Sequence, residues 1–356
     1  MMNSAPNDEL LVYVGSYAPA SSESIYVYRL HPVTGALTLQ QSLSGIVNPS
    51  FLTLDPKRNR LYAVSEVGEG AGQAAAYAIR PEDGSLDFSN SVSSLGRASC
   101  YVTLDGDSTC LLAANYTSGN VVLFPIEADG RVGEAADQVQ HAGSSIRADR
   151  QSEPHPHAAV IDPGDRFVFV PDLGIDRIKV YRIGREPLRL IAHGEVPVTP
   201  GSGPRHMAFH RDIPYAYVIN ELDSTITAFA YEAGNGSLRP VQTVSALPEG
   251  FTDSSTCADI HISPSGSYLY GSNRGHDSIV VYAINRTDGT LTYVEHTPTL
   301  GATPRNFAVT PDGRLLLAAN QDTDSIVTFR VDLATGRLTP TGQTVNVSKP
   351  VCIKFA

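Results

Sequence analysis

The sequence predicts an all-β fold, a seven-bladed β-propeller with four antiparallel strands in each blade. Short alternating runs of β-branched and aromatic residues recur along all 356 residues, separated by Gly, Pro, Asp and Asn, whereas long helical periodicity is almost absent. A unit of two such runs also repeats six times in phase, with about 50 residues between successive starts, which is typical of propeller blades. Two separate β-sandwiches are the alternative, but they would not explain an in-phase repeat.

Each repeat unit supplies the first two strands of one blade. The unit HMAFHRDIPYAYVINE starts at His206, and the other units start at Ser50, Cys100, His157, Asp259 and Asn306. Most units continue into a third strand such as LDSTITAFAY, and a polar turn such as ATGRLTPTGQTV leads into a fourth.

The two ends of the chain supply the seventh blade. KPVCIKFA at the C-terminal end matches a first strand, while LLVYVGSY and SIYVYRL near the N-terminal end match second and third strands. Joining these halves closes the ring and removes the open sheet edges that a broken ring would expose. We therefore predict one propeller domain over residues 10–356, preceded by a flexible N-terminus over residues 1–9.

The charge and hydropathy patterns narrow the choice of partners. A formal net charge of −11 argues against nucleic acid or an anionic membrane surface as a partner. The N-terminal MMNSAPNDEL lacks the charged and apolar regions of a signal peptide, and no run of 18 uncharged apolar residues occurs, so we expect a cytoplasmic protein. The four cysteines lack metal-ligand spacing and are expected to be reduced and packed. The sequence does not indicate an oligomeric state.

Polar residues gather at one mouth of the predicted ring. In a propeller, the residues that enter the first strand of each blade and those that leave the second strand meet at the same end of the central channel. The candidate site residues at this mouth are His157, Arg205 and His206 from the entering positions and Asp172, Glu221 and Arg274 from the leaving positions. In this alignment His157 and His206 occupy equivalent positions. The alternative is a solvated rim, since polar residues at strand ends are usually exposed.

His155 differs from the other candidates because it lies one residue out of phase, between Pro154 and Pro156. It is either a loop residue or a further contact for the substrate.

These residue types can support acid–base chemistry on an anion. A carboxylate and imidazoles can act as general base and acid, while guanidiniums bind an anionic substrate or stabilise an oxyanion. No nucleophile elbow, dinucleotide-binding motif or phosphate loop occurs, so we expect no cofactor. His155, His157 and Asp172 could instead ligate a metal, but arginines so close would repel the ion, and we expect no metal. The pattern favours hydrolysis or proton transfer on a small anion, and it would suit the opening of a lactone.

Five stretches resemble the seven-bladed-propeller lactonases, a family that includes the bacterial propeller-type 6-phosphogluconolactonase and the fungal carboxy-cis,cis-muconate cyclase. They are PHPHAAVIDPGDRFVFVPDLGIDRI (154–178), GPRHMAFH (203–210), AYVINELDS (216–224), PEGFTDSSTCADIHISPSGSYLY (248–270) and SNRGHDSI (272–279). The resemblance runs from about residue 10 to the C-terminus. By motif it implies catalytic roles for His157, Arg205, Glu221 and Arg274. His206, Asp172 and Asn115 are similar to residues of the family's substrate pocket.

The resemblance implies a lactonase without a cofactor, whose leading substrate would be 6-phosphogluconolactone, hydrolysed to 6-phosphogluconate in the pentose phosphate pathway. Glu221 or His157 would deprotonate the attacking water, and Arg205 and Arg274 would hold the anion and the oxyanion, while His206 would orient or protonate. The alternatives within enzymes are an unphosphorylated sugar lactonase and a muconate-type lactonising cyclase. A non-enzymatic binding propeller is the alternative of another class, although such modules commonly repeat Trp-containing surface motifs and this chain has no Trp.

Overall fold

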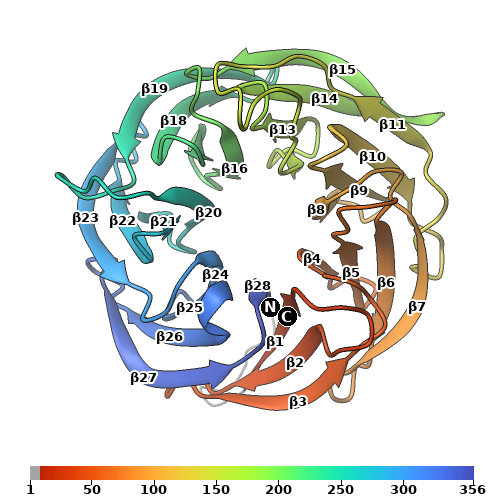
Figure 1. Ribbon diagram of the computed structural model, residues 1–356, viewed down its shortest axis with the longest axis horizontal. Helices are drawn as coiled ribbons and strands as arrows, with labels where there is room; N and C mark the ends of the chain where they lie inside the picture. Colours follow the sequence, from red (N-terminus) through yellow and green to blue (C-terminus); the bar gives the residue numbers. More distant parts are fainter. Residues whose placement is uncertain (1–8) are drawn as a thin grey trace.

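A computed structural model of the chain describes residues 9–356 and arranges them as a ring of seven four-stranded sheets (Figure 1). Neighbouring strands pair antiparallel in the sheets, as in the pairing of β16 (Pro204–Phe209) with β17 (Tyr215–Asn220). The predicted seven-bladed, all-β propeller is therefore confirmed. The predicted flexible segment, residues 1–9, falls almost wholly on residues 1–8, which lie outside the described residues. Among residues 9–356, no helix is long and apolar enough to cross a membrane.

In each blade the four strands are arranged in order from the axis outward (Figure 1). The ring-closing blade contains β28 (Pro350–Phe355), β1 (Leu10–Ser16), β2 (Ile25–Leu30) and β3 (Leu37–Leu43). The next three blades contain β4 (Leu52–Asp55), β5 (Arg60–Ser65), β6 (Gln73–Ile79) and β7 (Leu86–Ser93); β8 (Ser99–Leu104), β9 (Cys110–Asn115), β10 (Asn120–Pro125) and β11 (Asp137–Gln140); and β12 (Val160–Ile161), β13 (Val168–Asp172), β14 (Arg177–Arg185) and β15 (Leu188–Pro197). The last three contain β16, β17, β18 (Thr225–Glu232) and β19 (Ser237–Ser245); β20 (Thr256–Ile262), β21 (Tyr268–Arg274), β22 (Ser278–Ile284) and β23 (Leu291–Pro298); and β24 (Pro304–Val309), β25 (Leu315–Asn320), the 3-10 turn η1 (Gln321–Thr323), β26 (Ser325–Val331) and β27 (Leu338–Asn346).

The hydrophobic core lies between neighbouring blades. Second strands such as β9 (CLLAAN) and β25 (LLLAAN) are buried along their whole length, because each sheet is covered on both faces by the sheets beside it. Outer strands such as β27 are largely exposed. Burial is therefore complete in these second strands, lower in first strands such as β4 and β12, and lowest at the rim. The inner strand ends are the place where buried polar groups can face a pocket.

A repeated hydrogen bond joins neighbouring blades. The hydroxyl of Tyr217 in β17 donates to the carbonyl oxygen of Gly289 in the next blade at 3.0 Å. The same bond recurs from Tyr13 to Gly84 (2.8 Å), from Tyr62 to Gly130 (2.9 Å) and from Tyr270 to Gly336 (3.0 Å). All four glycines adopt φ between 73° and 83°, a left-handed conformation that residues with a Cβ rarely adopt. The turn glycines thus present their carbonyls to the tyrosines.

The chain ends meet in the ring-closing blade, as predicted. Strand β28 pairs antiparallel with β1, so that Val12 lies opposite Phe355 and Val14 opposite Ile353. All four cysteines are free and buried, which agrees with the expectation that they are packed thiols.

Candidate active site

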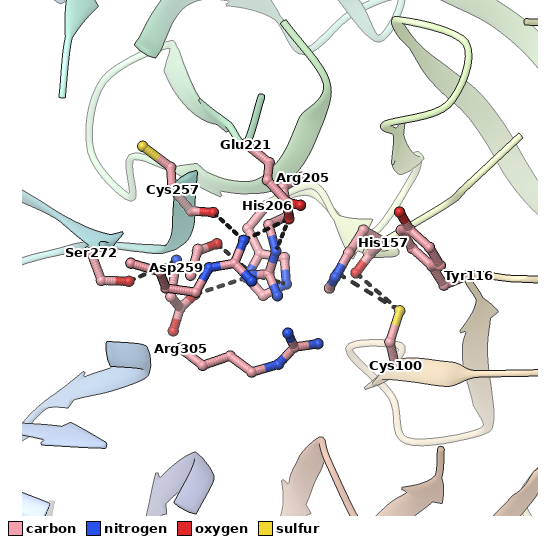
Figure 2. Close-up of polar contacts among 12 residues, drawn as sticks. Cys100, Tyr116, His157, Arg205, His206, Glu221, Cys257, Asp259, Ser272 and Arg305 are labelled. Atoms are coloured by element: carbon pink, nitrogen blue, oxygen red, sulfur yellow. Dashed lines mark hydrogen bonds and ion pairs between the residues drawn. The ribbon is translucent and has the colours of Figure 1, made fainter. Parts of the chain in front are cut away.

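A narrow pocket lies where the first strands of the blades begin, and Figure 2 shows its charged side chains. It contains about 220 Å³ of space between atoms, part of it open solvent. Its lining comes from six of the seven blades and consists of Ser50, Phe51, Cys100, His157, Arg205, His206, Arg305, Asn306 and Val351. Three of the predicted site residues, His157, Arg205 and His206, therefore meet in one pocket.

A β-bulge turns two consecutive residues toward this pocket. In β16 the pairing with β17 skips Arg205, which is an extra residue without a partner on β17. Such a bulge breaks the alternation of facing sides, and both Arg205 and His206 line the pocket. Equivalent shifts in register occur at Cys100 in β8 and at Arg305 in β24.

The register corrects the predicted equivalence of the two histidines. The proline before His157 bridges Asp172, just as the proline before Arg205 pairs with Asn220. His157 is therefore equivalent to Arg205, and its predicted equivalence with His206 is wrong by one residue. The alternation of residues along a strand does not reveal the extra residue of the bulge. Positions on the N-terminal side of the bulge are therefore aligned one residue out of register between blades.

The same register moves Asp172 away from the mouth, to the position of Asn115 and one residue before that of Glu221. Its buried carboxylate accepts hydrogen bonds from the backbone N–H of His155 at 2.7 Å and from Nδ1 of His141 at 2.6 Å. Asp172 thus holds the segment that leads into the pocket, and it lies outside the pocket lining. Its predicted contact with substrate stays a prediction.

Asn115 and His155 also lie outside the pocket lining. Asn115 is fully buried, and its amide accepts from the hydroxyl of Ser99 at 2.6 Å and donates to the carbonyl of Ser94 at 2.8 Å. The His155 ring stacks on Tyr116 with 4.3 Å between centroids, and its Nδ1 lies 2.9 Å from the Tyr116 carbonyl oxygen. The structure therefore gives both residues supporting contacts, and their binding roles stay predictions.

Glu221 gathers three guanidiniums at the edge of the pocket. Its Oε2 lies 2.9 Å from Nε of Arg205 and 2.9 Å from Nη2 of Arg274. Its Oε1 lies 2.6 Å from Nη2 of Arg150. Burial alone would raise the pKa of Glu221, but Arg274, Arg205 and Arg150 together outweigh burial and lower the pKa to about 2. Glu221 is therefore an ionised anchor for the arginines.

Arg305 is the least engaged cation of the pocket. Within residues 9–356 its guanidinium makes no hydrogen bond, although Nη2 lies 4.0 Å from Oε1 of Glu66 and the group sits 5.4 Å from the ring centroid of Tyr17. Figure 2 shows it reaching into the space below His206. Its donors are therefore available to an anion, and a guanidinium can bind a carboxylate or phosphate through two of them at once.

The two pocket imidazoles are neutral. Burial first, and then the charge of Arg205, lowers the pKa of His206 to about 4 although Asp259 opposes the change. Burial and the same guanidinium hold the pKa of His157 well below its usual range. His206 contacts Asp259 through Nδ1 at 2.8 Å, whereas Nδ1 of His157 faces the sulfur of Cys100 at 3.7 Å. Both rings can accept a proton at neutral pH.

The site carries positive charge although the chain is acidic overall. Its charged groups are the guanidiniums of Arg150, Arg205, Arg274 and Arg305 and the carboxylates of Glu66, Glu221 and Asp259. Four positive charges against three negative ones favour an anionic ligand, because most of these charges are largely buried and are poorly screened by solvent.

Phe51, Tyr101 and His206 form an aromatic cluster, here called the aromatic floor, of which Phe51 and His206 line the pocket. The Phe51 and Tyr101 rings stack at 4.1 Å, and His206 meets them edge-on at 5.8 and 5.3 Å. Lys354 places its ammonium 4.5 Å from the Phe51 ring centroid and lines a larger hollow of about 1160 Å³, part of it open solvent, together with His261 at the far ends of the first strands. We place the site in the smaller pocket, because there the guanidiniums, carboxylate and imidazoles converge.

Arg150, Asp259 and Arg305 are not among the predicted site residues, although the repeat places Asp259 and Arg305 at the mouth. Arg305 precedes Asn306 in TPRNFAV as Arg205 precedes His206 in GPRHMAF, so the repeat itself carried the signal. Arg150 comes from the irregular segment 141–156 between two blades, where no repeat position exists.

Fold and site together define a β-propeller that carries an arginine-rich pocket at one end of its axis. Among residues 9–356, no group of three His, Cys, Asp or Glu side chains could hold a metal ion. The available chemistry is proton transfer by imidazole and charge stabilisation by guanidinium.

The chain belongs to the family described as "Lactonase, 7-bladed beta-propeller", whose pattern matches residues 11–355. It is 38% identical over 343 residues to the 6-phosphogluconolactonase of Bacillus subtilis, covering 96% of this chain and 97% of the relative. It is 35% identical to the 6-phosphogluconolactonase of Formosa agariphila, covering 83% of this chain and 85% of the relative. The periplasmic gluconolactonase of Pseudomonas aeruginosa has a solved structure that superimposes with a TM-score of 0.92 at 34% identity, covering 98% and 99% of the two chains.

Proposed function

We propose that this protein is a lactonase that hydrolyses 6-phosphogluconolactone to 6-phosphogluconate. The observation that carries the proposal is the pocket itself, in which the free guanidinium of Arg305 lies beside two neutral imidazoles, His157 and His206. A doubly charged phosphate suits a site with excess positive charge, and a neutral imidazole suits the deprotonation of water. The names of the Bacillus subtilis and Formosa agariphila relatives support the same substrate.

The proposed roles follow from the contacts of each group. Arg305 binds the phosphate, because it lines the pocket and its nearest carboxylate oxygen, on Glu66, is 4.0 Å away. Arg150, which pairs with Glu221 outside the pocket lining, is the second candidate for this contact. Arg205 is buried and held by Glu221, so it is placed to stabilise the oxyanion that forms at the lactone carbonyl. Arg274 shares that anchor. We assign Glu221 to charge compensation, because both of its oxygens already accept from guanidiniums.

A plain sugar lactone is the second candidate substrate. The Pseudomonas aeruginosa relative is named a gluconolactonase, without a phosphate in the name, and it shares the fold over almost the full chain. The ring chemistry would be the same in both cases, so the arginines would decide between the two substrates.

The test is hydrolysis of freshly prepared 6-phosphoglucono-δ-lactone, coupled to 6-phosphogluconate dehydrogenase, beside glucono-δ-lactone and against the spontaneous rate. We expect acceleration of the phosphorylated lactone. In Arg305→Met, kcat/KM for this substrate should fall about ten- to hundredfold, the value of one charged hydrogen-bond contact, with little change for glucono-δ-lactone. Arg337→Met is the matched control, because Arg337 is an exposed arginine paired with Glu295.

One result would contradict the substrate assignment, and another would contradict the role of Arg305. Wild-type protein that accelerates glucono-δ-lactone alone would favour the second candidate. An equal loss on both lactones in Arg305→Met would remove the phosphate-binding role of that arginine.

We also propose that the protein acts in the cytoplasm, where four free thiols stay reduced. The Pseudomonas aeruginosa relative is named as periplasmic. Cell fractionation with an antibody to the native protein separates the two locations.

A further inference from the structure

The general base must have an acceptor atom that the protein leaves available to a water molecule. Glu221 is unsuited, since its Oε1 and Oε2 face three guanidiniums at 2.6 to 2.9 Å. Among the residues that line the pocket, His157 and His206 are the ones whose side chains commonly act as a general base. They differ in what lies behind them.

We propose that His206 is the general base of the lactone hydrolysis proposed above, and that Asp259 is the positioning residue that holds its imidazole in the reactive tautomer. The inference rests on the proposed function for its substrate. The arrangement of His206 and Asp259 is a property of the free protein and can be tested without any substrate.

Both carboxylate oxygens of Asp259 accept hydrogen bonds from neighbouring groups. Oδ1 accepts from Nδ1 of His206 at 2.8 Å and from the backbone N–H of Ile260 at 3.0 Å. Oδ2 accepts from Nε2 of His261 at 2.9 Å and from Nδ2 of Asn306 at 2.5 Å. The carboxylate is almost fully buried, and Figure 2 shows it beside His206. These bonds leave it little freedom to move.

An ionised carboxylate can only accept a hydrogen bond, so Nδ1 of His206 must carry the ring proton. Nε2 is then unprotonated, and it faces Nη1 of Arg205 at 3.3 Å. That distance is long for a hydrogen bond, so a water molecule bound to the substrate can compete for Nε2. An aspartate behind a histidine has this same orienting role in Ser–His–Asp sites.

His157 lacks such support. Its Nδ1 lies 3.7 Å from the sulfur of Cys100, and no carboxylate of the described residues contacts the ring. Protonation of His157 would add a positive charge between Arg205 and Arg305 without compensation. Protonation of His206 would be compensated by Asp259.

The groups that face His206 come from several blades. Arg205 precedes His206 on β16, and Asp259 lies beside it on β20 with His261 as its further neighbour. The ring centroid of His157, before β12, lies 5.2 Å from that of His206, and Tyr101 of β8 meets the His206 ring edge-on. Burial and Arg205 hold the pKa of His206 at about 4 in the empty pocket. An anionic substrate that pairs with the guanidiniums removes part of that repulsion and raises the pKa of His206 toward neutrality, so the base becomes stronger when substrate is bound.

The proton balance closes over one turnover. Nε2 takes a proton from water as the water oxygen bonds to the lactone carbonyl carbon, and a guanidinium stabilises the oxyanion. The tetrahedral intermediate then breaks the bond between that carbon and the ring oxygen, and the imidazolium returns its proton to the ring oxygen. The product is a hydroxy acid, whose carboxyl proton passes to solvent.

Three variants test the proposal by steady-state kinetics. His206→Asn keeps a donor to Asp259 but cannot accept the proton, and Asp259→Asn turns the acceptor into a donor that favours the opposite tautomer. Each should lower kcat about 100-fold or more, with KM changed by less than about threefold, because neither exchange removes an arginine. His210→Asn is the matched control, since His210 is equally buried beyond the other end of β16 and contacts Gly266.

Two further readouts separate a base from a structural residue. Added imidazole should raise the activity of His206→Ala about tenfold or more, and should leave the activity of His210→Asn unchanged. In wild type, the acid limb of kcat should lie at higher pH than that of kcat/KM, because kcat reports the complex and kcat/KM the free enzyme.

The tautomer is measured independently by ¹⁵N–¹H correlation spectra of the histidine side chains in the substrate-free protein. We expect the Nδ1-protonated pattern for His206, and its loss in Asp259→Asn. An Nε2-protonated His206 would overturn the proposal, and so would a His206→Asn variant that keeps more than half of the wild-type kcat. If wild type hydrolyses no lactone, the proposed function fails whatever the tautomer. If wild type is active and His206→Asn is also active, the function stands and the assignment of the base falls.

Discussion

Replacement of Glu221 by Gln tests whether this carboxylate is the charge anchor of the arginine cluster. Gln has nearly the same shape but no charge, so it leaves Arg150, Arg205 and Arg274 without their shared partner. The pKa of Glu221 is about 2 instead of the ordinary 4.5, which corresponds to about 3 kcal/mol of stability at pH 7. With an unfolding entropy of about 0.7 kcal/mol/K for a chain of this length, the variant should melt about 4 °C below wild type.

The dependence on pH gives the sharper test of the same idea. The pKa of Glu221 is lower in the folded than in the unfolded state, so its contribution is complete above about pH 4.5 and is lost as the pH falls toward 2. The difference between wild type and Glu221→Gln should therefore shrink to about 1 kcal/mol near pH 3. Calorimetry between pH 3 and pH 7 measures it.

The control for this experiment is Glu195→Gln. Glu195 forms an exposed pair with Lys179, and we expect its replacement to cost less than about 1 kcal/mol. Activity alone is a poor readout, because loss of the anchor would also disturb the arginines. A Glu221→Gln variant that has the melting temperature of wild type at pH 7 but lacks activity would refute the role of Glu221 as charge anchor. Glu221 would then again be a candidate for the general base.

Three further predictions concern the scaffold. Tyr217→Phe removes the donor to the carbonyl of Gly289 and should lower the free energy of unfolding by about 1 kcal/mol in urea titrations; an unchanged midpoint would show that the bond between blades adds nothing. Gly174→Ala would place its Cβ 1.9 Å from the carbonyl oxygen of Glu153, so the segment before His157 must shift, and we expect a loss of about 1 to 3 kcal/mol together with lower activity; full activity would contradict the close contact. Burial raises the pKa of all four thiols, so a thiol reagent at pH 8 should react with none of them in the native protein and with four after denaturation, whereas fast reaction in the native state would contradict their burial.

The fold could be predicted because its information is local and repeated. The alternation of residues in a stretch such as AYVINE determines a strand with both faces covered, and six copies in phase determine a ring. Even the closing blade was predictable, since KPVCIKFA completes the half blade at the other end of the chain.

The site could be predicted in part, because its residues stand at repeated positions of the strands. His157, Arg205 and His206 line the pocket, and Glu221 and Arg274 meet at its edge. Their catalytic and binding roles stay predictions.

The remaining details depend on geometry that alternation does not encode. The bulge at Arg205 inserts one residue and moves the register, so His157 was aligned with the wrong neighbour. Asp172 was placed at the mouth although its carboxylate faces His141. Arg150 approaches from an irregular segment, and only the folded ring brings it to Glu221.

The aromatic floor determines how molecules enter and leave. The Phe51 ring stacks on Tyr101, meets His206 edge-on and lies 4.5 Å from the ammonium of Lys354, so packed rings lie between the two hollows. We therefore expect substrate to enter and product to leave on the same side of the ring. Product and substrate then compete for the same binding site, so product inhibition should be purely competitive. The hydroxy acid product carries one more negative charge than the lactone. It should therefore bind the arginines more tightly than the substrate does, and we expect product release to be slow.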